Sequence, residues 1–326
     1  MTATVNDCTQ SVLDAQAFAA MVGERTRALP QECLATLESS PLGFEILTAS
    51  EREEHLLRAL RGSEASDVRV SGPHRAADWE RGWEENLHAF EASDGELGML
   101  VPKYNRHRVL RLHGDYIRVE HPRFEYAVYT ALRQFLFRKW FGDVQRVVEF
   151  GCGTGTSLLL LHELFPRMQL CGLDWAESSV RLLGRIAQRR SCAIEAGRID
   201  MFAPGGGVEL GSGTGVLTSA ALEQLGETFE PMLERLLAGR PSVCLHIEPL
   251  FELYDADSLF DDVARRYHMR RNYLRGFVPR LQQLEREGRA EILALRRTGF
   301  GSFFHEGYGI VVWRPTGQPA TQRRGG

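Results

Sequence analysis

The stretch from Arg146 to Ser157 constrains the fold of this chain most, because it predicts a buried strand, a glycine turn and a helix start in direct succession. Val147, Val148 and Phe150 are the β-branched and aromatic residues typical of a central strand. Glycine then occupies three of the next five positions, which allows a ligand to approach the backbone closely. Four leucines at 158–161 predict the buried side of the helix. The stretch indicates an α/β fold with a ligand at the end of a central strand.

The glycine turn differs from loops that bind pyrophosphate. The dinucleotide fingerprint has glycine at its first, third and sixth positions, and here the sixth position is Thr156. Glu149, near the end of the strand, would repel a phosphate and attract a cation. The ligand expected here is therefore a nucleoside with a cationic, amino-acid-like arm, which disfavours a nicotinamide oxidoreductase.

The segment from Val148 to Gly155 resembles the first motif of the class I S-adenosylmethionine-dependent methyltransferases, and the resemblance covers roughly residues 120–315. It implies a Rossmann-like, doubly wound α/β sheet of seven strands, with S-adenosyl-L-methionine as the cofactor. The residues expected to contact the cofactor lie in the glycine turn and at the ends of the following strands: Glu149, Gly151, Cys152, Gly153, Gly155, Asp174, Trp175, Asp200, Met201 and Ala220.

Within that set, two acids are expected to contact specific parts of the cofactor. Asp174 follows a predicted strand over 169–173 and lies 19 residues after Gly155, close to the spacing of an acid that accepts hydrogen bonds from ribose hydroxyls. Trp175 can lie flat against adenine, with core packing as the alternative. The resemblance assigns contact with the adenine amino group to Asp200, with the Met201 backbone alongside.

Polar side chains follow the strands predicted over 216–220 and 243–247. Ligands of doubly wound sheets bind at the carboxyl ends of the strands, and an acceptor that carries a proton needs a base. The candidates for that base are Glu223, His246, Glu248 and His305. The candidates for acceptor contacts are Tyr116, Gln224, Glu252, Tyr254 and Tyr308. The acids at this edge favour a cationic acceptor, so methylation of an amino or guanidino nitrogen in secondary metabolism is the expected function. The alternatives are methylation of a hydroxyl on a sugar or other metabolite, and a non-catalytic regulator that binds the cofactor.

Three regions are expected along the chain. Residues 1–120 read as a mainly helical accessory region or lid, residues 121–315 as the methyltransferase domain, and residues 316–326 as a disordered tail. In the first region Trp79 and Trp83 lie on an apolar helix face, for which core packing is expected and a lid over the substrate is the alternative. Residues 109–119 predict a strand pair, and residues 124–141 an amphipathic helix. The basic run over 265–275 is expected to be a solvated face.

Composition excludes several classes of protein. The chain has 326 residues and a net charge of −4, which disfavours a dedicated nucleic-acid binder. It has no apolar run long enough to predict a membrane span. Its six cysteines show no paired spacing, which is typical of reduced thiols in a cytoplasmic protein. The histidines show no helix-spaced ligand pair, so no metal is expected. A small-molecule acceptor is the expected partner, and a homodimer is left open.

Overall fold

The computed structural model describes residues 10–102 and 107–317, and its centre is a seven-stranded sheet in the order β10-β12-β9-β8-β5-β6-β7. Neighbours from β9 through β8, β5 and β6 to β7 are parallel, whereas β12 is antiparallel to both β9 and β10. The strands are β5 (Arg146–Phe150), β6 (Gln169–Asp174), β7 (Ile194–Arg198), β8 (Thr214–Ser219), β9 (Val243–Glu248), β10 (Ala290–Arg296) and β12 (Gly309–Pro315). The predicted Rossmann-like sheet of seven strands is confirmed.

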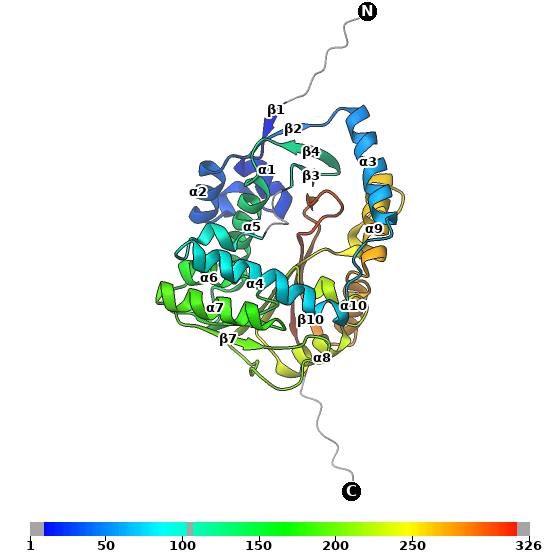
Figure 1. Ribbon diagram of the computed structural model, residues 1–326. Helices are drawn as coiled ribbons and strands as arrows, with labels where there is room; N and C mark the ends of the chain where they lie inside the picture. Colours follow the sequence, from blue (N-terminus) through cyan, green and yellow to red (C-terminus); the bar gives the residue numbers. More distant parts are fainter. Residues whose placement is uncertain (1–9, 103–106, 318–326) are drawn as a thin grey trace, which may run out of the picture.

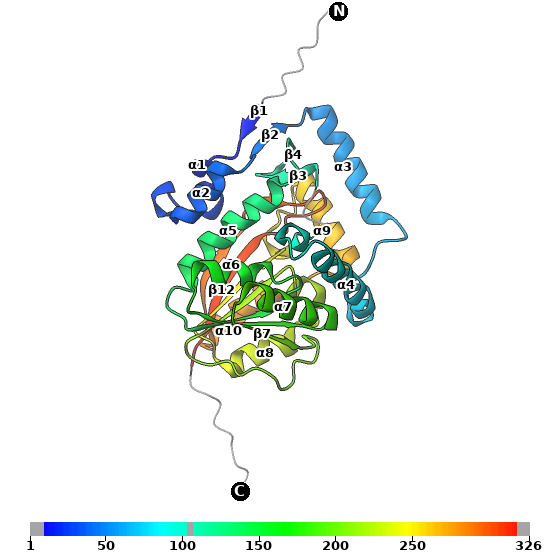
Figure 2. The same ribbon diagram turned by 60° about the vertical axis from the view of Figure 1, so that its left-hand side comes forward.

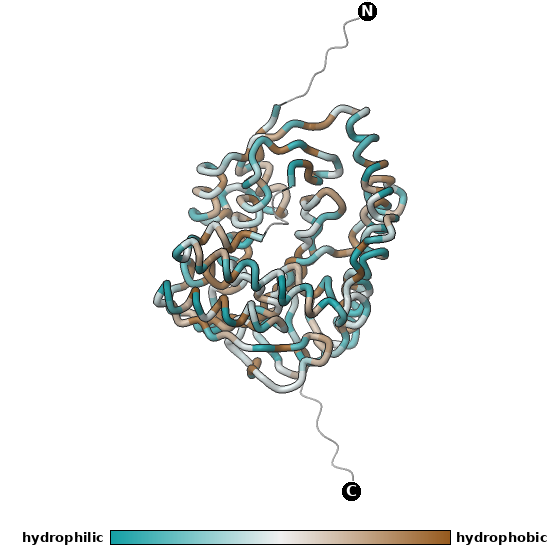
Figure 3. The backbone as a smooth tube through the Cα atoms, viewed as in Figure 1, coloured by the Kyte–Doolittle hydropathy of each residue, from teal (hydrophilic) through white to brown (hydrophobic). Residues whose placement is uncertain are grey.

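Helices cover both faces of this sheet (Figures 1 and 2). Along β5, Val147 packs in the cluster that holds residues of α5, α6 and α7, and Val148 packs in the cluster that holds residues of α8 and α10. Burial on both faces explains why the successive positions Val147 and Val148 are both apolar. The helices of this part are α5 (Phe124–Trp140), α6 (Thr156–Leu164), α7 (Glu177–Arg190), α8 (Glu230–Gly239), α9 (Leu259–Arg271) and α10 (Phe277–Arg286). In Figure 3 hydrophilic and hydrophobic residues alternate along the outer helices, as expected for elements with one buried face.

The N-terminal region contains strands as well as the expected helices. Its helices are α1 (Ala15–Val22), α2 (Gln31–Ser39), α3 (Ala49–Glu64) and α4 (Ala76–Ala92). A second, antiparallel sheet has the order β1-β2-β4-β3-β11, formed by β1 (Gln10–Val12), β2 (Gly43–Ile46), β3 (Val109–Leu112), β4 (Asp115–Val119) and β11 (Phe300–Gly301). The pair β3 and β4 is the strand pair predicted from the sequence. Because β11 comes from the chain between β10 and β12, the second sheet takes strands from both sides of residue 120.

The N-terminal helices pack on the core at separate places. Helix α2 lies against α5, α3 lies against α9, and α4 lies against α7 and crosses the front of the molecule in Figure 1. Short 3-10 helices complete the elements: η1 (Thr26–Ala28), η2 (Pro73–Arg75), η3 (Leu97–Leu100), η5 (Leu222–Leu225) and η6 (Phe251–Leu253).

Helices α9 and α10 begin and end at identifiable residues. Helix α9 begins at Leu259, where the Ser258 side chain caps it, and Asn272 ends it in a left-handed conformation at φ 52°. Helix α10 follows only after Gly276, at φ 85°. Residues 318–326, most of the predicted tail, lie outside the described residues. No helix among the described residues has the length and apolar content needed to cross a membrane.

Candidate active site

The glycine turn after β5 depends on left-handed backbone at three positions. Gly151, Gly153 and Gly155 have φ of +72°, +51° and +73°, which favours glycine at each. A Cβ at Gly151 would lie 2.5 Å from the Ala221 Cβ, and one at Gly153 would lie 3.0 Å from the Trp83 ring. The Gly155 position instead faces Leu183 of α7 at 2.7 Å. Gly151 and Gly153 therefore border the site, whereas Gly155 allows Leu183 of α7 to pack against the glycine turn.

Two adjoining cavities open at the carboxyl ends of β5, β6 and β8. The larger has a volume of about 360 Å³, and both cavities are lined by Gly151, Ala220, Trp79 and Trp83. Ala220 ends β8 in a left-handed conformation at φ 51°, a strained backbone for an alanine. The smaller cavity is mostly apolar, with walls from Trp175, Ile199, Met201, Phe202 and Leu225 beside Asp174.

Asp174 lines the smaller cavity and is hydrogen-bonded to the glycine turn, which lines the larger one. Its Oδ2 accepts a hydrogen bond from the Gly153 amide at 2.9 Å, and its Oδ1 accepts one from the Ala176 amide at 3.0 Å. Burial raises the pKa of this carboxyl, and the two amides oppose the rise. Each oxygen keeps a second lone pair, so the side chain can still accept hydrogen bonds from a ligand.

Asp200 does not reach either cavity. The side chain is exposed, and its Oδ1 accepts a hydrogen bond from the Phe202 amide at 2.9 Å. It stabilises its own turn, so the role in adenine binding expected for it is revised. The neighbouring Met201 does line the smaller cavity, and Trp175 lies 6.1 Å from Phe202 between ring centroids.

Glu149 provides the strongest sign of a ligand. It lies on β5, is 3% exposed and lines the larger cavity together with Cys152. Its Oε2 is buried and has no hydrogen-bond partner among the described residues. Burial raises the pKa of the carboxyl to about 8, although Ser157, through a hydrogen bond, and Arg133 of α5, through its charge, oppose the rise. A buried carboxylate oxygen without a partner is costly, so this position favours a ligand that brings a cation or a donor.

His246 belongs to the core and not to the site. Its Nε2 accepts a hydrogen bond from the Trp313 indole at 2.9 Å, which leaves Nδ1 to donate to Thr218 Oγ1 at 2.9 Å. The residue is fully buried, and burial lowers its pKa to about 3. Both ring nitrogens are used internally, so His246 cannot act as the base that the sequence suggested.

Glu248 also has a structural position. Its two oxygens accept hydrogen bonds from the amides of Ala221, Leu222 and Glu223 at 3.0 to 3.2 Å. Burial raises its pKa to about 7, and these amides oppose the rise. The side chain fixes the turn after β8, which corrects its expected role as a base.

Glu223 is the acid that this turn presents to the larger cavity. Its Oε1 accepts a hydrogen bond from Gln224 Nε2 at 2.8 Å, and the Gln224 oxygen accepts one from Ser71 at 3.0 Å. Burial and the nearby Glu248 raise the pKa of Glu223 to about 8. Gln224 itself lines the smaller cavity.

The segment after β11 forms another wall of the larger cavity. Tyr308 donates a hydrogen bond to Glu125 of α5 at 3.0 Å, and Glu125 is also 2.9 Å from His107 Nδ1. His305 Nδ1 lies 3.1 Å from His268 Nε2. Burial lowers the pKa of His305 well below its usual value, so its ring is neutral at pH 7.

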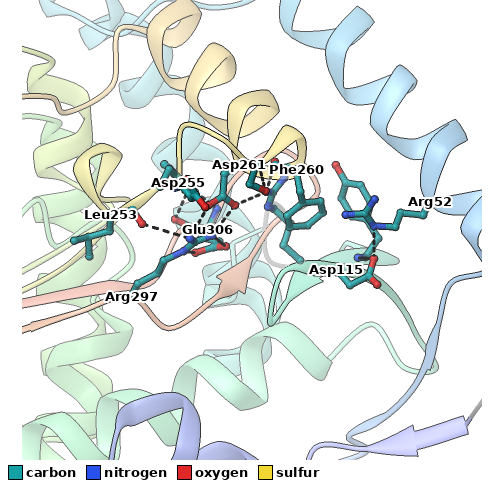
Figure 4. Close-up of polar contacts among 12 residues, drawn as sticks. Arg52, Asp115, Leu253, Asp255, Phe260, Asp261, Arg297 and Glu306 are labelled. Atoms are coloured by element: carbon teal, nitrogen blue, oxygen red, sulfur yellow. Dashed lines mark hydrogen bonds and ion pairs between the residues drawn. The ribbon is translucent and has the colours of Figure 1, made fainter.

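A buried ion-pair network behind this wall holds the segment in place (Figure 4). Arg297 contacts both Asp261, with two distances of 2.6 Å, and Glu306, with two distances of 2.7 Å. The fully buried Arg111 donates to the Phe260 carbonyl at 2.6 Å. The network connects β3, α9 and the segment that carries His305.

Three expected acceptor contacts lie away from the cavities. Tyr116 is buried in a small apolar cluster with Phe260, and the Tyr254 hydroxyl accepts a hydrogen bond from the Glu306 amide at 2.9 Å. Glu252 accepts one from the Gly276 amide. All three support the protein around the site, which corrects their expected contact with the acceptor.

Several lining residues were not expected to form the site. Trp79 and Trp83 of α4 stack with ring centroids 5.5 Å apart and line both cavities, so core packing alone does not describe them. The Trp79 indole nitrogen is buried and has no partner among the described residues. Tyr129, Tyr267, Arg271, Tyr273 and Phe304 also line the larger cavity. Within residues 10–102 and 107–317, no three His, Cys, Asp or Glu side chains gather as metal ligands would.

Fold and site together define a Rossmann-like α/β protein with a ligand site at the carboxyl ends of its parallel strands. No protein-family model and no curated protein matches the sequence. Similar solved structures include a cyclase and several methyltransferases, one of them described as a SAM-dependent methyltransferase from Aquifex aeolicus. The cyclase SpnF is 15% identical with a TM-score of 0.49, over 78% of this chain and 100% of SpnF. The plantazolicin methyltransferase BpumL is 12% identical with a TM-score of 0.43, over 75% and 98%. The 16S rRNA methyltransferase RmtF is 14% identical with a TM-score of 0.43, over 93% and 98%.

Proposed function

We propose that this protein binds S-adenosyl-L-methionine and catalyses transfer of its methyl group to a small molecule. The observation that carries the proposal is the buried Glu149 oxygen, which lines the larger cavity and has no partner among the described residues. A cationic, amino-acid-like arm would supply the missing charge and the missing hydrogen-bond donor. The same arm would be close to the bare backbone of Gly151 and Gly153.

The smaller cavity suits the nucleoside part of this cofactor. Asp174 offers two acceptor oxygens for ribose hydroxyls. Trp175, Met201 and Phe202 provide apolar walls for an adenine ring. The unpartnered Trp79 indole nitrogen is a donor for a polar atom of the ligand.

The cofactor, when bound, supplies a methyl group that its sulfonium already activates. The work of the protein is then to align the acceptor, exclude water and accept a proton. Trp79 and Trp83 cover the cavities and limit access of water. The cavity of about 360 Å³ falls in the range of small-molecule sites, and the net charge of −4 does not favour a nucleic-acid acceptor.

Within this proposal the acceptor atom is a nitrogen, and Glu223 takes its proton. Glu223 lines the larger cavity, and its raised pKa of about 8 lies much nearer to the pKa of an ammonium group than to that of an aliphatic hydroxyl. A matched pKa favours proton transfer between an amine and this carboxyl. Methylation of a hydroxyl in the acceptor screen would contradict the assignment of a nitrogen acceptor.

The experiment measures both cofactor binding and methyl transfer. Calorimetry with S-adenosylmethionine should show binding, and a screen of amines and alcohols should show S-adenosylhomocysteine formation with amines. The Glu223→Gln variant should lose turnover and keep cofactor affinity, while Glu227→Gln, an exposed acid nearby, should keep both. No cofactor binding would refute the proposal at its base. Binding without turnover on any acceptor would instead support a regulator.

A further inference from the structure

Arg271 is a cation that the proposed reaction does not yet use. It is the last residue of α9 and lines the larger cavity with Tyr267, Tyr273 and His305. Its Nη2 donates to the Tyr273 hydroxyl at 2.6 Å, and its guanidinium carbon lies 4.8 Å from the centre of that ring. The tyrosines hold the guanidinium in one place at the cavity wall.

No carboxylate forms an ion pair with this guanidinium. Among residues 10–102 and 107–317 no Asp or Glu oxygen lies within 4.0 Å of it, Glu223 acts on it only at longer range, and its Nε is buried without a hydrogen-bond partner. Arg297, which lies behind the cavity wall, differs from Arg271 because it forms ion pairs with both Asp261 and Glu306. A partly buried arginine that has a free N–H and no counterion is poised to bind an anion.

The other groups around the cavity do not supply the missing negative charge. Burial and Glu248 keep the pKa of Glu223 at about 8, although Glu223 lies close enough to Arg271 for the guanidinium to lower that pKa, so the ionised form that acts as the proposed base is a minor form at pH 7. Glu125 is shared between His107 and Tyr308, and Glu149 has a pKa of about 8 and faces the proposed cofactor. His305 is neutral, and Tyr267 and Tyr273 have pKa values raised by burial.

We infer that the methyl acceptor carries an anionic oxygen group, a carboxylate or a phosphate, and that Arg271 binds it. This inference rests on the proposed function, because it assigns the larger cavity to the acceptor. Arg271 would receive the group through its guanidinium at the cavity wall, with the Tyr273 hydroxyl beside it. Together with Glu223, it selects an acceptor that has both an amine and an acid, as amino acids and their relatives do.

The test uses small aromatic probes that carry either an anionic or a neutral polar group. Benzoate, phenyl phosphate and the neutral benzamide are titrated into the protein by calorimetry, with and without S-adenosylhomocysteine. Benzoate or phenyl phosphate should bind at least tenfold more tightly than benzamide, and the tighter of the two identifies a carboxylate or a phosphate as the group recognised. Arg271→Gln should remove that preference, and Arg271→Lys should restore part of it.

The matched control is Arg270→Gln, which changes the exposed neighbour on the same helix and should leave the preference unchanged. Melting temperatures establish that each variant is folded. Equal binding of benzoate, phenyl phosphate and benzamide, or an unchanged preference in Arg271→Gln, would overturn the inference. Failure of the proposed function looks different: S-adenosylmethionine then fails to bind while the anion preference and its dependence on Arg271 remain.

Discussion

At the scale of single residues, Glu248 shows how one buried acid can organise a site that it does not touch. Its carboxylate accepts the amides of Ala221, Leu222 and Glu223 and so fixes where Glu223 faces the cavity. Glu248→Gln places a donor against those amides. Hydrogen bonds to a charged group contribute about 1.5–3 kcal/mol each, so at pH 8, above the Glu248 pKa of about 7, the variant should lose at least that much free energy of unfolding in urea. Glu195→Gln, an exposed change on β7, should lose almost nothing. Equal stability of the two variants would contradict this role for Glu248.

The residues of the site also separate what the sequence could predict from what it could not. Glu149 and the glycine turn were predictable, because a strand apolar on both faces followed by three spaced glycines has few other uses. His246 and Glu248 were misassigned because a polar residue at a strand end can face either a cavity or a neighbouring backbone, and sequence spacing does not distinguish the two. Arg271 was hidden among neighbouring arginines that do face solvent, such as Arg270.

At the scale of elements, the packing of α7 against the glycine turn depends on Gly155. A Cβ there would lie 2.7 Å from Leu183, on a backbone at φ +73°. Gly155→Ala should therefore cost about 1–3 kcal/mol of unfolding free energy through overpacking, with additional cost from the backbone. Gly184→Ala, in open space within α7, should instead stabilise the protein by about 0.5–1 kcal/mol. Urea unfolding of both variants tests the pair, and a neutral Gly155→Ala would contradict the packing.

Helix α4 is the second element with a testable role, because it carries both tryptophans over the cavities. Trp79→Ala should weaken binding of S-adenosylmethionine by about 0.5–1.5 kcal/mol, the scale of one aromatic contact, and by more if the indole nitrogen binds the ligand. Trp140→Ala removes a tryptophan of similar exposure at the end of α5 and should leave the affinity unchanged. Calorimetry compares the two, and equal affinities would remove α4 from the cofactor site.

At the scale of the whole molecule, the N-terminal region and the seven-stranded sheet share one core. Phe18 and Leu37 belong to the same buried cluster as Val147 and Leu245, and β11 pairs with β3. We therefore expect one cooperative thermal transition, with calorimetric and van't Hoff enthalpies nearly equal. Two resolved transitions would mean that residues 1–120 unfold separately. The shared sheet was not predictable, because β11 is only two residues long and has no sequence pattern of its own.

The central claim is that Glu149 binds the cationic arm of S-adenosylmethionine, and its protonation provides the most direct measurement. With a pKa of about 8, most Glu149 carboxyls are protonated at pH 7, and a bound cation favours the ionised form. Binding should therefore release a proton, and affinity should rise as pH increases from 6 to 8.

Calorimetric titration with S-adenosylmethionine at pH 7, in two buffers of different ionisation enthalpy, measures that proton directly. We predict proton release by the natural protein and its loss, together with weaker binding, in Glu149→Gln. Glu195→Gln should behave as the natural protein. Absence of binding, or the same proton release in Glu149→Gln, would contradict the account.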